Sequence, residues 1–309
     1  MYAQSGVALR TLRIFWVFFC IIICSKNGYT RANDIGLIGL GRPAADEFSD
    51  PAVSRYRNLT SELAIVMTPR GLQPAETLGL SGFEFALFTT AANINENASY
   101  WTGQPGTPVL EGPLNGRTIP ENLWITGMQI RKGLPLSTDV GVNLTFLNGS
   151  HLLMLGGEAK IAIHESFYRW VPALAVRGAF SQLLGTDQLD MACGELDVLA
   201  SLPVGIGGMA QIVPFVGAGV FVIHVNSGVI DETPSFVTDD ATDQRGGTGG
   251  SLYVFPTLDW HDHQFNRYLV GLRLNFAMMA LLYQFDIAIP QFNRDKQMAS
   301  HTIKLGFDT

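Results

Sequence analysis

The sequence predicts an all-β fold in which antiparallel strands close into a barrel of about ten strands. Three observations predict it. The last part of the chain alternates apolar and polar residues through three successive segments, and similar alternating segments recur from about residue 78 onward. The chain is also rich in apolar residues, with 47% hydrophobic and only 15% charged. A period of two is typical of strands with one apolar and one polar face.

The alternation is clearest in residues 266–309. Every even position from 268 to 276 is apolar, whereas the odd positions include Arg267, Arg273 and Asn275. A soluble sandwich buries such an apolar face against a second sheet, whereas a membrane barrel turns it toward lipid and keeps the charges inside. The same pattern returns in residues 281–289 and 302–308.

The final strand, Thr302-Ile-Lys-Leu-Gly-Phe-Asp-Thr309, resembles the closing strand of outer-membrane β-barrel proteins from Gram-negative bacteria. The last residue of that class is usually aromatic. Here it is Thr309, and Phe307 is the nearest aromatic residue of the same parity. The resemblance implies a transmembrane barrel in the bacterial outer membrane. It also implies outer-membrane lipid as a partner and a barrel-insertion machinery that recognises this strand.

The first 32 residues are interpreted as a secretory signal peptide. Arg10 and Arg13 precede an apolar run over residues 14–24, and Ala32 offers a small-residue cleavage site. The run is shorter than the about 20 residues that a membrane-spanning helix needs. Cleavage removes Cys20 and Cys24 and leaves Cys193 without an intramolecular partner.

Residues 33–77 lack the alternation, and we expect a periplasmic arm that packs into or under the barrel. Asp50 and Pro51 are suited to begin a short helix, which Thr68 and Pro69 would end. A strand over residues 61–67 is the alternative.

The barrel is expected to span residues 78–309. Residues 198–223 carry no charge, which alone would suggest a transmembrane helix. Repeated Gly and Pro instead favour a turn followed by a strand. The ten expected strands are 78–89, 123–131, 139–146, 154–165, 171–180, 191–202, 209–225 and the three C-terminal segments.

An even number of strands places both long connections, residues 91–120 and 226–263, on one side of the membrane. Short turns, such as residues 132–135, fall on the other. Outer-membrane barrels have this arrangement, with long loops outside and short turns in the periplasm. Twelve strands are the alternative, if residues 61–67 and 251–257 both pair.

Charged residues on the inward parity carry the main functional hypothesis. They could line a narrow constriction that passes small polar solutes, or pair across the interior and only stabilise the barrel. The predicted lumen-lining residues are Glu84, Arg131, Asp139, Glu158, Lys160, Arg177, Glu195, Asp197, Arg267, Arg273, Asp286 and Lys304.

Asp259 and His261 belong to the densest titratable cluster, at the end of the second long loop. Such a pair can activate a water molecule or hold a metal. It resembles half of the site of omptin-type surface proteases, with Asp239-Asp240 as the candidate second half. The alternative is a polar loop end beside the interfacial aromatic residues Trp260, Phe265 and Tyr268.

The remaining motifs point to no cofactor. Two Gly-rich stretches, residues 39–44 and 205–210, lack the strand–turn–helix setting of a dinucleotide site, and residues 245–250 lack the Lys of a P-loop. A net charge of −7 excludes nucleic acid as an expected partner. We expect a narrow porin-like channel or structural barrel. The alternatives are a surface protein that binds a partner through residues 91–120 and 226–263, and the rim hydrolase.

Overall fold

The computed structural model describes residues 33–104, 109–110, 118–165, 171–207, 210–231, 252–292 and 296–308. The chain divides into two compact units, Met1–Thr30 and Arg31–Thr309, and the second contains every helix and strand of the described residues. The predicted signal peptide and Asp239-Asp240 lie outside the described residues. In the described part of the chain, no helix is both long enough and apolar enough to cross a membrane.

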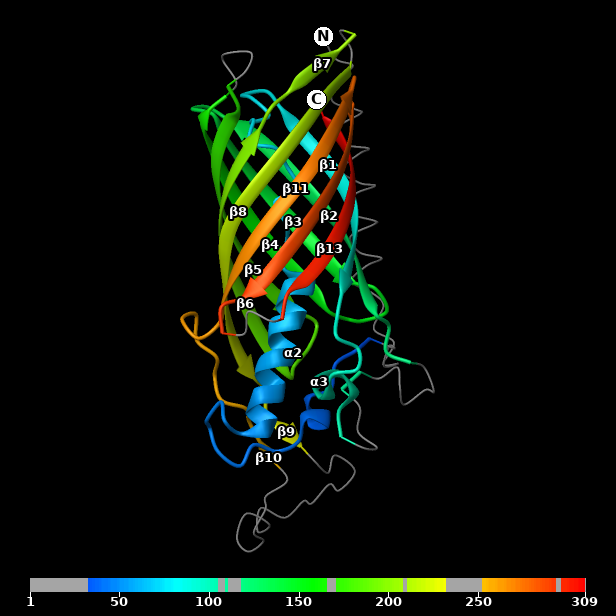
Figure 1. Cartoon of the computed structure of the whole chain (residues 1–309), viewed down its shortest axis with the longest axis vertical. Coiled ribbons are helices and arrows are strands. Elements are labelled where there is room, and N and C mark those ends of the chain that lie inside the picture. The colour runs from blue at the N-terminus through cyan, green and yellow to red at the C-terminus, as the bar shows by residue number, and fades with distance from the viewer. Residues whose placement is uncertain are drawn as a thin grey trace, which may run out of the picture. The chain divides into compact units, whose positions relative to one another are not determined.

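Ten antiparallel strands form a closed barrel, as the alternation predicts (Figure 1). Each strand pairs with its neighbour along the chain, and β13 returns to pair with β1, where Asp308 lies opposite Glu84. The strands are β1 (Phe83–Asn93), β2 (Asn122–Leu134), β3 (Thr138–Leu147), β4 (Leu153–His164), β5 (Ala173–Leu184), β6 (Leu189–Ser201), β8 (Ala210–Ser227), β11 (Gln264–Phe276), β12 (Met279–Pro290) and β13 (Met298–Asp308).

The twelve-strand alternative is wrong. Residues 61–67 are helical, and Leu252–Tyr253 forms β10, which pairs with β9 (Ile230–Asp231) in a separate sheet of two strands. The short strand β7 (Val204–Ile206) pairs with the beginning of β8 and extends that edge beyond β6. The uncharged stretch 198–223 is therefore the end of β6, then β7 and most of β8, and the helical interpretation is also wrong.

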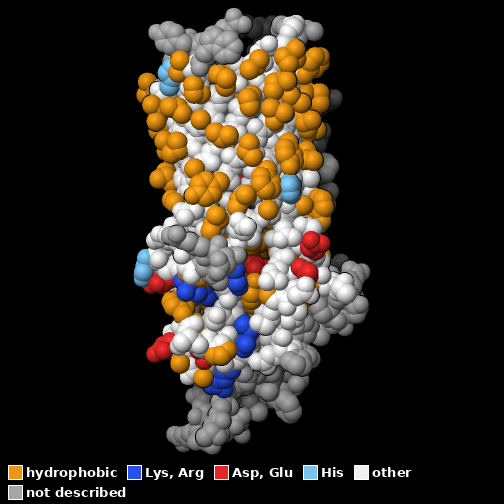
Figure 2. Space-filling model, viewed as in Figure 1, with side chains coloured by type: hydrophobic (Ala, Val, Ile, Leu, Met, Phe, Trp, Pro, Cys, Tyr) orange, Lys and Arg blue, Asp and Glu red, His pale blue; other side chains and the backbone are white. Residues whose placement is uncertain are grey.

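Side chains alternate between the two faces of the barrel wall. In β4 nearly every second residue is buried, and the outward Leu155, Ile161 and Ile163 are exposed. Figure 2 shows the resulting apolar surface, which covers the visible wall of the barrel and stops where the loops begin. An outer wall of this kind matches lipid rather than water.

The two ends of the barrel differ. One end carries tight turns, such as residues 135–137 and 277–278, and we call it the turn end. The other carries the two long connections, residues 94–121 and 228–263, and we call it the loop end. The helix α3 (Ser99–Thr102) lies in the first connection, and β9 and β10 lie in the second.

The N-terminal segment contains a short 3-10 helix, η1 (Leu37–Leu40), and the helix α2 (Pro51–Met67). The predicted helix start is confirmed, because the Asp50 carboxylate accepts hydrogen bonds from the backbone N–H groups of Ala52 and Val53 at 2.7 and 3.3 Å. Thr68 leaves the helical conformation directly before Pro69. The strand alternative for residues 61–67 is wrong.

The sequence analysis expected residues 33–77 to form a periplasmic arm that packs into or under the barrel. In the structure η1 and the start of α2 lie at the loop end (Figure 1). From there α2 enters the barrel, and the chain continues extended through the interior to β1. Counting strand parity from β1 onward carries no information about where the preceding residues lie.

Three named regions describe this arrangement. The wall is the ten strands, and the plug is residues 59–78, which comprise the second half of α2 and the extended segment after it. The cap is the described part of residues 33–58, 94–121 and 228–263. One apolar core joins the cap and α2 to the loop-end half of the wall, and a smaller one joins the plug residues Leu72 and Ala75 to the wall nearer the turn end.

Candidate functional site: the occupied lumen

The twelve predicted lumen-lining side chains all lie inside the barrel, and none is more than 7% exposed. Six are acidic and six are basic, so their formal charges cancel. Ionised groups in such surroundings need close partners, because an unpaired buried charge is strongly unfavourable. Whether they line a path for solutes depends on what else occupies the lumen.

Arg177 is the centre of the first charged cluster. Its guanidinium lies 2.7 Å from Glu158, 2.8 Å from Glu195 and 2.6 Å from Asp197. The register of β4, β5 and β6 places these residues together, since Arg177 lies opposite Asp197 on one side and next to the β4 residues on the other. Arg267 supplies a second cation, 3.2 Å from Glu195.

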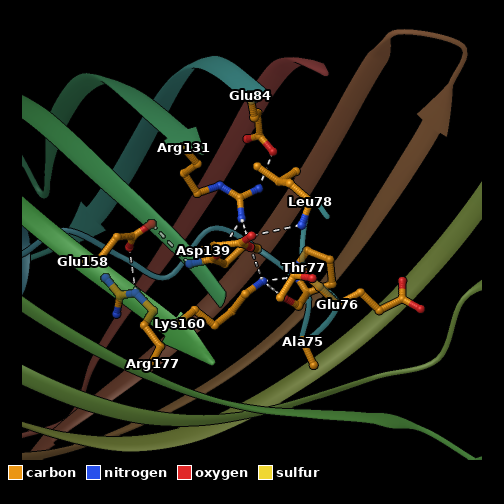
Figure 3. A network of polar contacts seen from close by, with 12 residues as sticks. Ala75, Glu76, Thr77, Leu78, Glu84, Arg131, Asp139, Glu158, Lys160 and Arg177 are labelled. Atoms are coloured by element: carbon orange, nitrogen blue, oxygen red, sulfur yellow. Dashed lines mark hydrogen bonds and ion pairs between the residues drawn. The ribbon is translucent and has the colours of Figure 1, made fainter. Parts of the chain in front are cut away.

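Glu84 is the centre of the second cluster. Its carboxylate forms ion pairs with Arg131, Lys304 and Arg273, and the Arg273 contact is 3.1 Å. Asp139 connects this cluster to Lys160 of β4, because it lies 3.7 Å from Arg131 and 3.2 Å from Lys160 (Figure 3). The two clusters together surround the extended part of the plug.

Two wall lysines bind the plug through its backbone. The Lys304 ammonium donates to the carbonyl oxygen of Leu72 at 2.8 Å. The Lys160 ammonium donates to the carbonyl oxygens of Pro74 and Glu76 at 2.9 and 2.6 Å (Figure 3). Extended chain inside a barrel has no neighbouring strand of its own, so the wall side chains satisfy its carbonyl groups.

Wall acceptors bind the backbone N–H groups of the same stretch. The N–H of Ala75 donates to the Ser201 hydroxyl at 3.1 Å, and that of Leu78 donates to the Asp139 carboxylate at 3.0 Å. The wall thus supplies both donors and acceptors to the plug backbone.

Side chains of the plug complete the contact. Arg70 donates to the Ser300 hydroxyl at 3.2 Å and lies 3.7 Å from Asp286. Gln73 donates to Glu158 at 3.2 Å and accepts from Arg131. Gly71 leaves room for the Arg177 side chain, since a Cβ atom there would lie only 3.1 Å from the Arg177 Cδ.

No family model matches this chain, and no curated protein matches it. Its fold is similar to the N-terminal β-barrel domain of Pseudomonas aeruginosa OprF, with 12% identity over 75% of this chain and 99% of that one, at a TM-score of 0.29. It is also similar to Ail of Yersinia pestis, with 10% identity, 74% and 99% coverage and a TM-score of 0.28. LpxR from Salmonella typhimurium matches with 12% identity, 72% and 99% coverage and a TM-score of 0.31.

These are bacterial outer-membrane β-barrel proteins. They belong to the class that the final strand resembles. At these identities and TM-scores they assign no residue role and no activity to this chain. Only the contacts within the chain itself therefore indicate what its lumen does.

The cap is held to α2 by buried polar contacts. The Glu62 carboxylate is 6% exposed and accepts from the Tyr100 hydroxyl and, at 2.6 Å, from the Trp101 indole N–H, which fixes α3 against α2. Lys296 donates to the Tyr100 hydroxyl at 3.3 Å. Burial lowers the pKa of Lys296, and the nearby Glu62 opposes that shift. Glu62, Glu121 and Lys296 also line a polar cavity of about 350 Å³ at the loop end.

Arg57 links the first half of α2 to the second long connection. Its guanidinium lies between the rings of Phe48 and Phe292, 4.3 and 4.0 Å from their centroids. It donates to the His263 ring nitrogen Nε2 at 3.1 Å and to the Asp262 carbonyl at 2.7 Å. Burial and the Arg57 charge lower the pKa of His263 to about 3, so that this ring is neutral.

Asp259 and His261 are not part of the lumen. Both side chains are exposed in the cap, and their ligand atoms lie within 4.8 Å of one another and of Asp262. His261 lies 3.4 Å from Asp262, and Asp259 lies 3.5 Å from the His224 ring. The proposed second half of a rim site, Asp239-Asp240, is outside the described residues.

Sequence reasoning found the wall charges but missed the plug residues that meet them. Arg70 and Gln73 lie in a stretch without periodicity, and their wall partners are 58 or more positions away along the chain. The one available signal was a charged residue directly after the predicted helix. The Gly-rich stretches 39–44 and 205–210 lie at η1 and at the β7–β8 connection, in the parts that are described.

Proposed function

We propose that this chain is a plugged β-barrel of the bacterial outer membrane, one that passes little or no solute and anchors a cap that binds a partner at the cell surface. The observation that carries the proposal is the filled lumen. The wall charges are bonded to one another and to the plug, and α2 occupies the loop-end half of the interior.

The outer wall supports the membrane part of the proposal. Large apolar side chains are exposed on neighbouring strands, including Val270, Leu281 and Ile303. An aqueous environment disfavours so extensive an apolar surface. The aromatic residues Trp124 and Trp260 are exposed near the loop end, where the apolar wall meets the polar cap, and Trp is suited to that boundary.

Conductance in planar bilayers tests whether the lumen is closed. The intact, refolded protein is expected to insert without discrete conductance steps. The double variant Lys160→Met/Lys304→Met removes the two wall donors to the plug backbone, and we expect it to show intermittent steps as the plug loosens. Lys132→Met is the matched control, because Lys132 also donates to backbone carbonyls, those of Leu80 and Gly82, but at the turn end.

Steady conductance of the intact protein would contradict the closed lumen and favour the porin-like alternative. In that case neutralisation of Arg177 or Arg273 should change ion selectivity. If none of the three proteins shows conductance steps, the result would favour a lumen that contacts other than those of these two lysines also keep closed.

Binding through the second long connection needs a separate measurement. Cells that display the intact protein are expected to attach to a binding surface, such as extracellular matrix or a second layer of cells, better than cells that display a variant without residues 232–250. Conductance and detergent-gel mobility of that variant should equal those of the parent. Equal attachment of both would contradict a binding role for the second loop.

No catalytic role is proposed. His261 is 77% exposed and its close acidic neighbours are loop residues of the same turn, Asp259 and Asp262. A hydrolase would lose turnover on His261→Ala while its barrel stayed folded, and this remains the direct check of that alternative.

A further inference from the structure

The course of the chain before β1 carries a further inference. Residues 33–58 belong to the cap at the loop end, and β1 begins at Phe83 at the turn end. The only residues between them are the plug and residues 79–82. The described N-terminal part of the chain therefore lies at one end of the barrel, and the first strand starts at the other end.

We propose that the barrel carries its own N-terminal segment across the membrane, so that residues 33–58 are displayed on the same side as the long loops. The inference rests on the proposed function only in that the barrel spans a membrane. It goes beyond that function because the lumen is then the path by which the chain's own N-terminal segment crosses the membrane. The same chain afterwards keeps the lumen closed.

The contacts inside the lumen fit a segment that is held in place. Along residues 72–78 the wall binds backbone atoms, through Lys160, Lys304, Ser201 and Asp139. Such contacts do not depend on the plug side chains, and each joins it to a different part of the wall. They fix how far the segment extends through the barrel.

Contacts at the loop end oppose withdrawal. Arg57 is stacked between Phe48 and Phe292, and Glu62 holds α3 across the side of α2. Trp101, Asp262 and Phe292, which contact α2, come from three separate connections of the barrel, so the helix cannot retreat into the lumen without breaking these contacts. The segment is thus bound at both ends of its path.

The surface of the displayed segment fits water. Residues 44–49 are all exposed and include Asp46 and Glu47. Phe48 is 41% exposed but its ring packs on Arg57. An arm of this composition has no apolar face that would hold it against the membrane, so the cap contacts account for its position.

Thiol labelling of intact cells tests the proposal. Single substitutions place a cysteine in the N-terminal segment, in the first long loop and in a turn, as Ala45→Cys, Ser99→Cys and Leu136→Cys; all three positions are exposed. The parent chain is the blank, because Cys193 is buried and because Cys20 and Cys24 fall in the expected signal peptide. A membrane-impermeant maleimide is added before and after the outer membrane is permeabilised, and detergent-gel mobility confirms that each barrel is folded. Glu47→Cys replaces Ala45→Cys if that variant does not fold.

The expected result is that Ala45→Cys and Ser99→Cys label in intact cells, whereas Leu136→Cys labels only after permeabilisation. Labelling of Ala45→Cys only together with Leu136→Cys would overturn the inference while leaving the membrane barrel intact. If Ala45→Cys and Ser99→Cys both stay unlabelled until permeabilisation, the result would support the threaded path and overturn the orientation with the loops outside. Equal labelling of all three in intact cells would overturn the membrane barrel itself, and the inference with it.

Discussion

At the scale of single residues, the lumen is organised by cations that each serve several partners. Arg177 contacts three carboxylates, from β4 and β6, and is fully buried. Without it, Arg267 still lies close to Glu195, and Gln73 and Gln129 still donate to Glu158. The cost of removing one partner from a buried charged group is large because these contacts leave the remaining carboxylates without enough positive charge.

We therefore predict that Arg177→Met lowers the free energy of unfolding by roughly 3–5 kcal/mol. The measurement is urea denaturation of the refolded barrel in detergent micelles. Lys132→Met is the control, since Lys132 binds only backbone carbonyls at the turn end, and its effect should stay below about 1 kcal/mol. Equal effects of the two substitutions would mean that the charged cluster is not buried as described.

His263 gives the cap a pH dependence. Its pKa is lowered to about 3 by burial and by the Arg57 charge, whereas an exposed imidazole has a pKa near 6.5. Between about pH 3 and pH 6.5, the His263 ring binds a proton when the cap is open but not when the cap is closed. The stability of the closed cap therefore falls as the pH is lowered from about 6.5 toward 3.

The measurement is the urea midpoint of the cap's transition, followed by tryptophan fluorescence, at pH 7 and pH 5. The midpoint of the parent should be lower at pH 5. In His263→Gln the difference between the two pH values should shrink, whatever the absolute stability of the variant. An unchanged difference would assign the pH dependence to other groups.

Sequence reasoning at this scale works for the wall and stops at the plug. Strand parity alone places Glu84, Arg131 and Lys304 on one face, because a strand's period is fixed by its backbone geometry. It does not say that Lys304 binds the carbonyl of Leu72, 232 positions away along the chain. That contact depends on closure of the barrel around a segment that has no period.

At the scale of elements, the strands are packed on the inside by large residues over small ones. The ring of Phe215 in β8 lies over Gly271 in β11, where an added Cβ would come within 2.1 Å of the ring. Such a contact cannot be relieved by a small shift, because Phe215 is itself 2% exposed and enclosed.

We predict that Gly271→Ala destabilises the barrel by about 1–3 kcal/mol through overpacking. Gly205→Ala is the matched control, since nothing lies within 4 Å of a Cβ at that position. Both are measured by the urea midpoint in micelles. A near-neutral Gly271→Ala would show that Phe215 moves freely and that this part of the lumen is loosely filled.

The expected and observed strands agree closely in order and in number, and their ends differ by up to five residues. The expected segment 139–146 is β3, Thr138–Leu147, and 209–225 is β8, Ala210–Ser227. The first strand begins later than expected, at Phe83, because residues 78–82 turn at the end of the barrel before pairing begins. The start of α2 was predictable from Asp50 and Pro51, which act locally, whereas the depth of the helix in the lumen depends on the whole wall.

At the scale of the whole molecule, one closed sheet carries two dissimilar environments. Its outer face is apolar across the strands, and its inner face holds balanced charges that bind the plug. The same ten strands therefore form a membrane surface and a polar binding surface. The occupied lumen is the consequence, since an empty interior of this width would leave the charges of the wall without the partners that Arg70 and the plug backbone supply.

The central claim, that residues 59–78 fill the lumen, is tested most directly by a crosslink. The Thr68 hydroxyl lies 3.4 Å from the Cys193 sulfur of β6, so Thr68→Cys places a second thiol beside the native one. Mild oxidation of the folded protein in membranes should form a disulfide, seen as a mobility shift on a non-reducing gel. The shift should be absent from Thr68→Cys/Cys193→Ser and from Ser54→Cys, which lies in the cap half of α2. A folded Thr68→Cys barrel that forms no crosslink would contradict the account.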